Sequence, residues 1–168
     1  DGQDLRDVSL ESLRASIAWI LVNRDGPRIQ PGPRCYRRSW IRDGTLTGLA
    51  LAEMGFADET RAFLRWYAPY QLEDGRVPCA VDHHGIDPVA EHDSHGELIW
   101  GIVELYRLTR DRRFLEELWP RVLRAVDAIA ALRALRTTTA HRGQACYGLL
   151  PESISHEGYA SRPVHSFW

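Results

Sequence analysis

The sequence predicts an all-α fold built from stacked αα-hairpins. Apolar residues recur at intervals of three and four in several segments, which is the spacing of one helix face. No segment alternates apolar and polar residues convincingly enough to predict a strand. A weak internal repeat also relates two units, each with an acidic helix start, an apolar helix, a short polar turn and a second helix. The matched positions are Asp43, Gly48, Phe63 and Leu64 in one unit and Asp93, Gly101, Phe114 and Leu115 in the next.

Residues 8–23 are predicted to form the first helix. Five apolar residues fall on one face of this segment, namely Leu10, Leu13, Ile17, Ile20 and Leu21. The run Asp25-Gly26-Pro27 follows, and such residues end helices. Residues 26–35 are rich in proline and glycine and are predicted to be a loop.

Two further helices are predicted at residues 40–54 and 57–70. Gly55 is placed to end the first of them in a left-handed conformation. The second carries aromatic residues at helical spacing, which we expect in the core rather than in contact with a ligand: Phe63, Trp66, Tyr67 and Tyr70. Residues 71–92 are predicted to be a long loop, and such loops in compact domains are often functional.

The fourth and fifth helices are predicted at residues 94–108 and 113–135. Ser94 and Glu97 have the spacing of a capping box at the start of the fourth helix. Pro120 predicts a kink or a restart within the fifth helix. Residues 136–164 show no helical period.

The repeat places a polar cluster at the start of the first helix in each unit. Stacking the units therefore collects these clusters at one end of the array. A helix start also has backbone N–H groups that lack helical partners and can bind acceptors. The sequence thus predicts a cleft floored by Arg42, Asp43 and Asp93.

Length and composition exclude several classes of protein. The 168 residues fit a single domain with a sizeable core. A formal charge of −2 argues against a nucleic-acid partner. No apolar run is long enough to cross a membrane. All 21 basic residues are arginine, so Schiff-base lysine chemistry is not available.

The three cysteines, Cys35, Cys79 and Cys146, form no CxxC pair and predict neither a zinc knuckle nor a disulfide framework. Free thiols favour a reducing compartment such as the cytoplasm, and no secretory leader is visible. The chain begins at Asp1 and ends at Trp168 in an aromatic stretch, so we expect it to be a piece of a longer protein.

The segment 36–44 combines side chains suited to bind a sugar. Arg42 offers a fork of donors and Asp43 two acceptor oxygens. Tyr36 and Trp40 add aromatic rings, and the flat apolar face of Trp40 suits a sugar ring. The alternative is a capping aspartate with a surface arginine and a core tryptophan.

The segment 91–97 is the second polar group. His92, Asp93 and His95 could ligate a metal ion, but their spacing matches no specific metal motif. We predict no metal and no cofactor, and we assign Asp93 and His95 to contacts with sugar hydroxyls. Solvated loop histidines are the alternative.

The segment 148–159 is the third polar group. Glycoside hydrolysis needs one protonated carboxyl and a second carboxylate, and Glu152 or Glu157 could be the acid if a partly dry pocket raised its pKa. No convincing second catalytic carboxylate is found in the chain. Ser155 and His156 lack a nucleophile elbow. An ordinary surface loop is the alternative.

The run Trp40-Ile-Arg42-Asp43 resembles the Trp-x-Arg-Asp motif of glucoamylase-type enzymes in the six-hairpin glycosidase superfamily. The resemblance implies an (α/α)6 toroid, of which this chain would be the N-terminal part, with the site at the N-terminal ends of the inner helices. It implies that Trp40, Arg42 and Asp43 hold the non-reducing sugar. Glu152 falls near the general acid of these enzymes, but Pro151 departs from their pattern, so Glu157 stays in contention.

The resemblance leads to our first hypothesis, an inverting hydrolase of α-glucosidic oligosaccharides whose general base lies in a later hairpin outside this chain. The second hypothesis is a non-catalytic carbohydrate-binding or scaffold fragment, because the second carboxylate is missing. The third is a metal-dependent enzyme that uses His92, Asp93 and His95. The expected partners are an oligosaccharide, together with the remaining hairpins of a longer chain or further copies of this one.

Overall fold

The computed structural model describes residues 2–154 and 164–165. This part contains five α-helices, which confirm a mostly helical fold. They are α1 Gly2–Val22, α2 Ile41–Glu53, α3 Ala57–Tyr67, α4 Ser94–Thr109 and α5 Arg112–Ala134. Three short 3-10 helices are η1 Arg34–Tyr36, η2 Ala68–Tyr70 and η3 Thr139–His141. The toroid implied by the resemblance stays a prediction.

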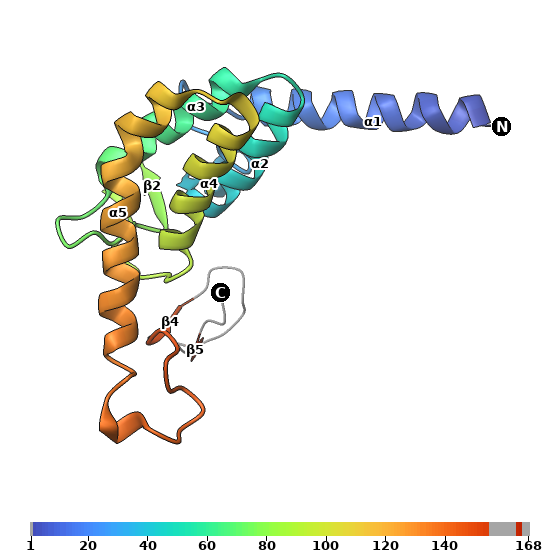
Figure 1. Cartoon of the computed structure of the whole chain (residues 1–168). Coiled ribbons are helices and arrows are strands. Elements are labelled where there is room, and N and C mark those ends of the chain that lie inside the picture. Colours follow the sequence, from blue (N-terminus) through green and yellow to red (C-terminus); the bar gives the residue numbers. More distant parts are fainter. Residues whose placement is uncertain (1, 155–163, 166–168) are drawn as a thin grey trace.

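Helices α2 to α5 form two hairpins that pack side by side (Figure 1). α2 packs against both α3 and α4, and α4 packs in turn against α5 and α3. The predicted repeat therefore corresponds to two stacked hairpins. Gly55, which follows α2, has a φ of 94°, the left-handed conformation expected of it.

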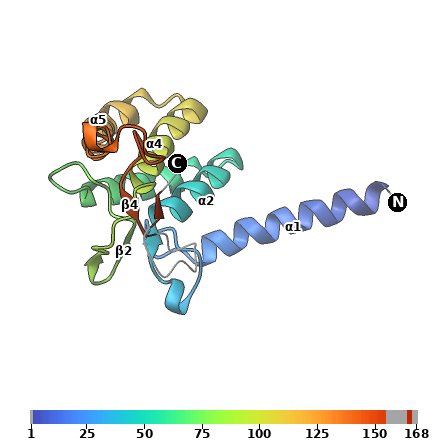
Figure 2. The ribbon, with the colours of Figure 1, turned by 90° about the horizontal axis from the view of Figure 1, so that it is seen from below.

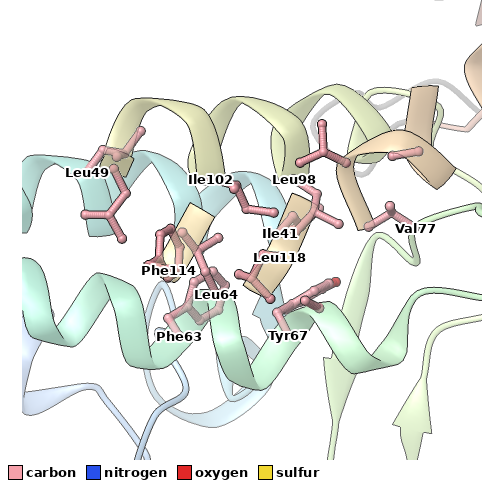
Figure 3. Close-up of a cluster of buried hydrophobic side chains, with 14 of the residues drawn as sticks. Ile41, Leu49, Phe63, Leu64, Tyr67, Val77, Leu98, Ile102, Phe114 and Leu118 are labelled. Atoms are coloured by element: carbon pink, nitrogen blue, oxygen red, sulfur yellow. The ribbon is translucent and has the colours of Figure 1, made fainter. Parts of the chain in front are cut away.

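The core lies between the two hairpins (Figure 3). Phe63 and Phe114, which the repeat relates, are both fully buried in it. Tyr67 packs against Phe63 with ring centroids 5.6 Å apart, and Trp66 and Tyr70 are partly buried against the same cluster. The aromatic residues of α3 are thus core residues, as predicted.

Two glycines let α2 approach its neighbours closely. Gly44 lies directly under the ring of Phe63, where a Cβ atom would collide with it. A Cβ atom on Gly101 of α4 would lie 2.7 Å from Cγ2 of Thr45 on α2. Neither position has room for a larger side chain.

The structure corrects the prediction that 71–92 is only a loop. β2 Ala80–Asp82 pairs antiparallel with β1 Ser39–Trp40 and with β3 Gly85–Ile86. The register places Ser39 opposite Val81. Ala80 and Val81 are buried, so their backbone groups need hydrogen-bond partners. Strands of two or three residues are too short to show an alternating pattern. A further pair joins β4 Glu152–Ser153 to β5 Val164–His165.

The predicted capping box at α4 is wrong. Asp93 precedes the helix and Ser94 already belongs to it, without a side-chain capping bond. The N–H of Glu97 instead donates to the backbone oxygen of Asp93 at 3.0 Å. α5 runs through Pro120 without a restart. It begins after Asp111, whose Oδ1 accepts from the N–H of Phe114 at 3.0 Å.

α1 extends away from the hairpins as a single rod (Figures 1 and 2). The predicted helix is confirmed, but its apolar face is largely exposed: Leu10 is 46% and Leu13 42% exposed. Only towards the end of α1 does Ile20 pack against the core cluster. No described helix combines the length and the apolar character needed to cross a membrane.

Candidate functional site

The N-terminal ends of α2 and α4 lie at the same end of the hairpin pair, and β4 lies beyond them (Figures 1 and 2). The pairing of β1 with β2 ties the start of α2 to the segment before α4, and the N–H of Ile41 donates to the backbone oxygen of Cys79 at 3.0 Å. The polar groups predicted at both helix starts are therefore brought to one place.

Arg42 is the centre of this cluster. It lies in the first turn of α2, and its Nη1 donates to Oδ2 of Asp93, which lies 51 residues later in the chain. Its Nη2 is 3.6 Å from Oε2 of the buried Glu91. Two carboxylates thus hold the guanidinium in a fixed orientation.

Glu97 joins the cluster from the first turn of α4. Burial raises the pKa of its carboxyl, and the negative charges of Asp93 and Asp43 raise it further, whereas Arg42 lowers it. Sequence reasoning missed Glu97 as a site residue because it assigned the side chain to a capping box. Its position four residues after Asp93 places both on one helix face, a signal that could have found it.

Trp40 lies at the end of β1. Cζ of Arg38 is 5.2 Å from its ring centroid, so one face of the indole is covered. Arg38 is itself held by Asp82 at 3.1 Å and by Asp87 at 2.5 Å. The Nε1 atom of Trp40 is buried and finds no hydrogen-bond partner among residues 2–154 and 164–165. That N–H is suited to donate to a ligand.

His95 lies in the first turn of α4. Its side chain is 2% exposed, and burial, followed by the charges of His92 and Arg76, lowers its pKa from 6.5 to about 4. Asp93 and Asp74 oppose this shift. Neither ring nitrogen has a hydrogen-bond partner in the described part of the chain. The charge of Asp93 thus raises the pKa of both Glu97 and His95.

Two of the other predicted residues, Tyr36 and Glu152, lie within the described ranges. Tyr36 lies in η1 and is 57% exposed, and no hydrogen bond or ring contact within the described residues links it to Trp40 or Arg42. Glu152 is exposed on β4, where it pairs with His165 through the backbone. Glu157 lies outside the described residues.

Other reactive groups do not add to the site. Over the described ranges, no three histidine, cysteine, aspartate or glutamate side chains are arranged to hold a metal ion. The Cys79 thiol is buried, and burial, reinforced by Glu91, raises its pKa to about 12. This thiol is therefore protonated near neutral pH.

Two known proteins share sequence with this chain. A protein of Methanocaldococcus jannaschii named as an uncharacterized glycosyl hydrolase is 29% identical over 115 residues, covering 64% of this chain and 18% of that protein. An MMP endo-(1,4)-3-O-methyl-alpha-D-mannosidase of Mycolicibacterium hassiacum is 30% identical over 89 residues, covering 52% of this chain and 24% of that enzyme. No family model matches the chain. These partial matches support a relationship to glycoside hydrolases.

Proposed function

We propose that this chain is part of an inverting glycoside hydrolase of the six-hairpin type, acting on α-glucosidic oligosaccharides. The observation that carries the proposal is the cluster of Arg42, Asp43, Asp93 and Glu97 beside Trp40, where two helix starts meet. The similarity to proteins named as a glycosyl hydrolase and a mannosidase supports the same class of reaction.

In the proposed site, Trp40, Arg42 and Asp43 bind the non-reducing sugar. Arg42 donates to ring hydroxyls from an orientation that Asp93 and Glu91 hold. The carboxylate of Asp43 accepts from hydroxyls, and the buried N–H of Trp40 donates to one. A sugar ring would then pack on the indole face opposite Arg38.

The catalytic carboxylates are proposed from the resemblance. Glu152 is the candidate general acid, and Glu157 stays the alternative. An inverting hydrolase needs a second carboxylate on the other side of the bond, with room for a water molecule between them. We expect this base to come from a hairpin outside these 168 residues.

Binding can be tested by titrating the chain with maltose and deoxynojirimycin while following tryptophan fluorescence. We expect saturable binding that weakens at least about tenfold in Asp43→Asn, because hydrogen bonds to a charged group contribute about 1.5–3 kcal/mol. A Trp40→Phe variant should lose the signal, which separates Trp40 from the other five tryptophans.

The matched control is Asp58→Asn, which changes an aspartate in the first turn of α3, away from the cluster. Equal affinity in Asp43→Asn and the parent chain, or no saccharide binding by a folded chain, would contradict the proposed site. An α-1,4-mannobiose arm tests whether a mannoside binds better than a glucoside.

A second candidate function is a carbohydrate-binding module without catalysis. The described carboxylates near Trp40 surround Arg42, which suits binding, whereas Glu152 is exposed on β4. Release of reducing sugar from maltooligosaccharides by this chain would exclude that candidate, and binding without turnover would favour it.

A further inference from the structure

A concave site lies beside Arg38, the arginine that covers one face of Trp40. A cavity of about 660 Å³ is lined by Asp25, Arg28, Gln30, Arg34, Arg37, Arg38, Asp82 and His83. Its volume falls in the range of small-molecule sites. None of the predicted sugar-binding residues belongs to this lining, so the cavity is distinct from the Arg42 cluster.

The cavity wall carries an excess of positive charge. Its four arginines face two aspartates, of which Asp25 pairs with Arg28 at 3.3 Å and Asp82 with Arg38 at 3.1 Å. Arg38 also pairs with Asp87 outside the lining at 2.5 Å, so the excess rests on Arg34 and Arg37. The guanidinium groups of Arg34 and Arg37 form no ion pair with any described residue. This local excess contrasts with the formal charge of −2 on the whole chain.

The backbone conformation at position 34 is one that disfavours arginine. Arg34 has a φ of 60°, in the left-handed region that is unfavourable for most side chains. Glycine or asparagine would adopt this conformation at lower cost. A strained residue is an indication of function when its side chain also lines a site, as Arg34 does.

Arg38 links the cavity to Trp40. Arg38 lines the cavity and also lies 5.2 Å from the ring centroid of Trp40. A sugar on the opposite indole face and a group in the cavity would therefore lie on either side of Trp40 and Arg38, and a substrate that fills both sites must pass around the edge of the ring. Arginine forks bind carboxylate, sulfate and phosphate oxygens in pairs and stay charged at all physiological pH values.

We propose that this arginine cavity binds an oxyanion carried by the saccharide held at Trp40, so that the substrate is an acidic oligosaccharide. The inference rests on the proposed function, because it needs a saccharide at Trp40. It extends that function from a class of reaction to a class of substrate.

Calorimetric titration of the whole chain tests this inference. The probes are maltotriose, an α-linked trisaccharide that contains one glucuronate, and inorganic phosphate. At low salt the acidic trisaccharide should bind at least about tenfold more tightly than maltotriose. The difference should shrink as salt is added, because ions screen exposed charges.

The test variant is Arg34→Asn with Arg37→Gln, since asparagine tolerates the left-handed backbone. The chain provides a matched control in Arg110→Asn with Arg113→Gln. Arg110 is also left-handed, with a φ of 57°, and both control residues are exposed and outside the cavity lining. Only the test variant should lose the preference for the acidic sugar, with its affinity for maltotriose unchanged.

Equal affinity for the two trisaccharides, or a preference that survives in the test variant, would overturn the inference and leave the proposed function intact. If neither trisaccharide binds a folded chain, both proposals fail. Phosphate binding that depends on Arg34 and Arg37, without a preference for the acidic trisaccharide, would show a site for free anions and would overturn the link to the saccharide.

Discussion

Helix α1 and the hairpins α2 to α5 carry the same kind of apolar spacing, yet they differ in burial. Phe63 and Leu98 are completely buried between the hairpins, whereas Leu10 and Leu13 of α1 are exposed. The apolar face of α1 and those of the hairpin helices were all predicted from apolar residues spaced three and four positions apart. The difference shows that spacing predicts which face of a helix is apolar but not what covers that face.

The exposed apolar face of α1 is a surface that one of the expected partners of this chain would cover. The remaining hairpins of a longer chain, or a second copy, would bury such a surface. A smaller apolar groove between α2 and α4 is also open, with Leu46, Trp100 and Leu108 among its lining residues. Both partners stay predictions.

The largest expected effect is in the core. Phe63→Ala removes a fully buried ring that contacts Tyr67 and lies over Gly44, so we expect the free energy of unfolding to fall by about 3–5 kcal/mol. Chemical denaturation followed by circular dichroism measures this change. A loss below about 1 kcal/mol would contradict the packing described here.

Burial at the start of α4 predicts a pH dependence. His95 has a pKa of about 4 when folded and about 6.5 when unfolded, so acid protonates the unfolded chain first. The contribution of neutral His95 to the free energy of unfolding is complete above pH 6.5 and is lost as the pH falls to 4. The loss is at most about 3 kcal/mol. His92, Arg76, Asp93 and Asp74 are the charged groups near it.

His95→Gln should therefore reduce the loss of stability between pH 7 and pH 4.5, as measured by denaturation at each pH. His84→Gln, at an exposed histidine, is the control. An unchanged pH profile in His95→Gln would contradict a buried neutral imidazole.

Two glycines of α4 allow a comparison within one helix. Gly101→Ala would place a methyl group against Thr45, and we expect a loss of about 1–3 kcal/mol. Gly96→Ala meets no atom within 4 Å and should stabilise the helix by up to about 1 kcal/mol. Thermal melts of the two variants should shift in opposite directions. Shifts of the same sign would count against the close approach of α2 and α4.

The smallest effect is expected in α1. Leu13→Ala should change the free energy of unfolding by less than about 0.5 kcal/mol, because the side chain is 42% exposed. Sedimentation of the parent chain and of Leu13→Glu tests self-association through this face. If the parent chain associates, the variant should dissociate, and association that persists in the variant would locate the contact elsewhere.

The sequence alone predicted the helices well because each has apolar residues at helical spacing, and Gly55 marks a clear stop after the second. It did not predict β1 to β3, since strands of two or three residues cannot display a period. The repeat placed Arg42 and Asp93 at the same end of the array, and the two side chains are in contact, whereas the cleft itself stays a prediction. Glu97 was missed because one glutamate can satisfy either a capping box or a site, and only tertiary contacts decide between them.

The long separation between Arg42 and Asp93 also has a consequence for folding kinetics. Each hairpin forms from neighbouring segments, whereas the site needs groups 51 residues apart, whose approach costs more chain entropy. We therefore expect helices to form before the site does during refolding. Recovery of saccharide binding should then lag behind recovery of the helical signal.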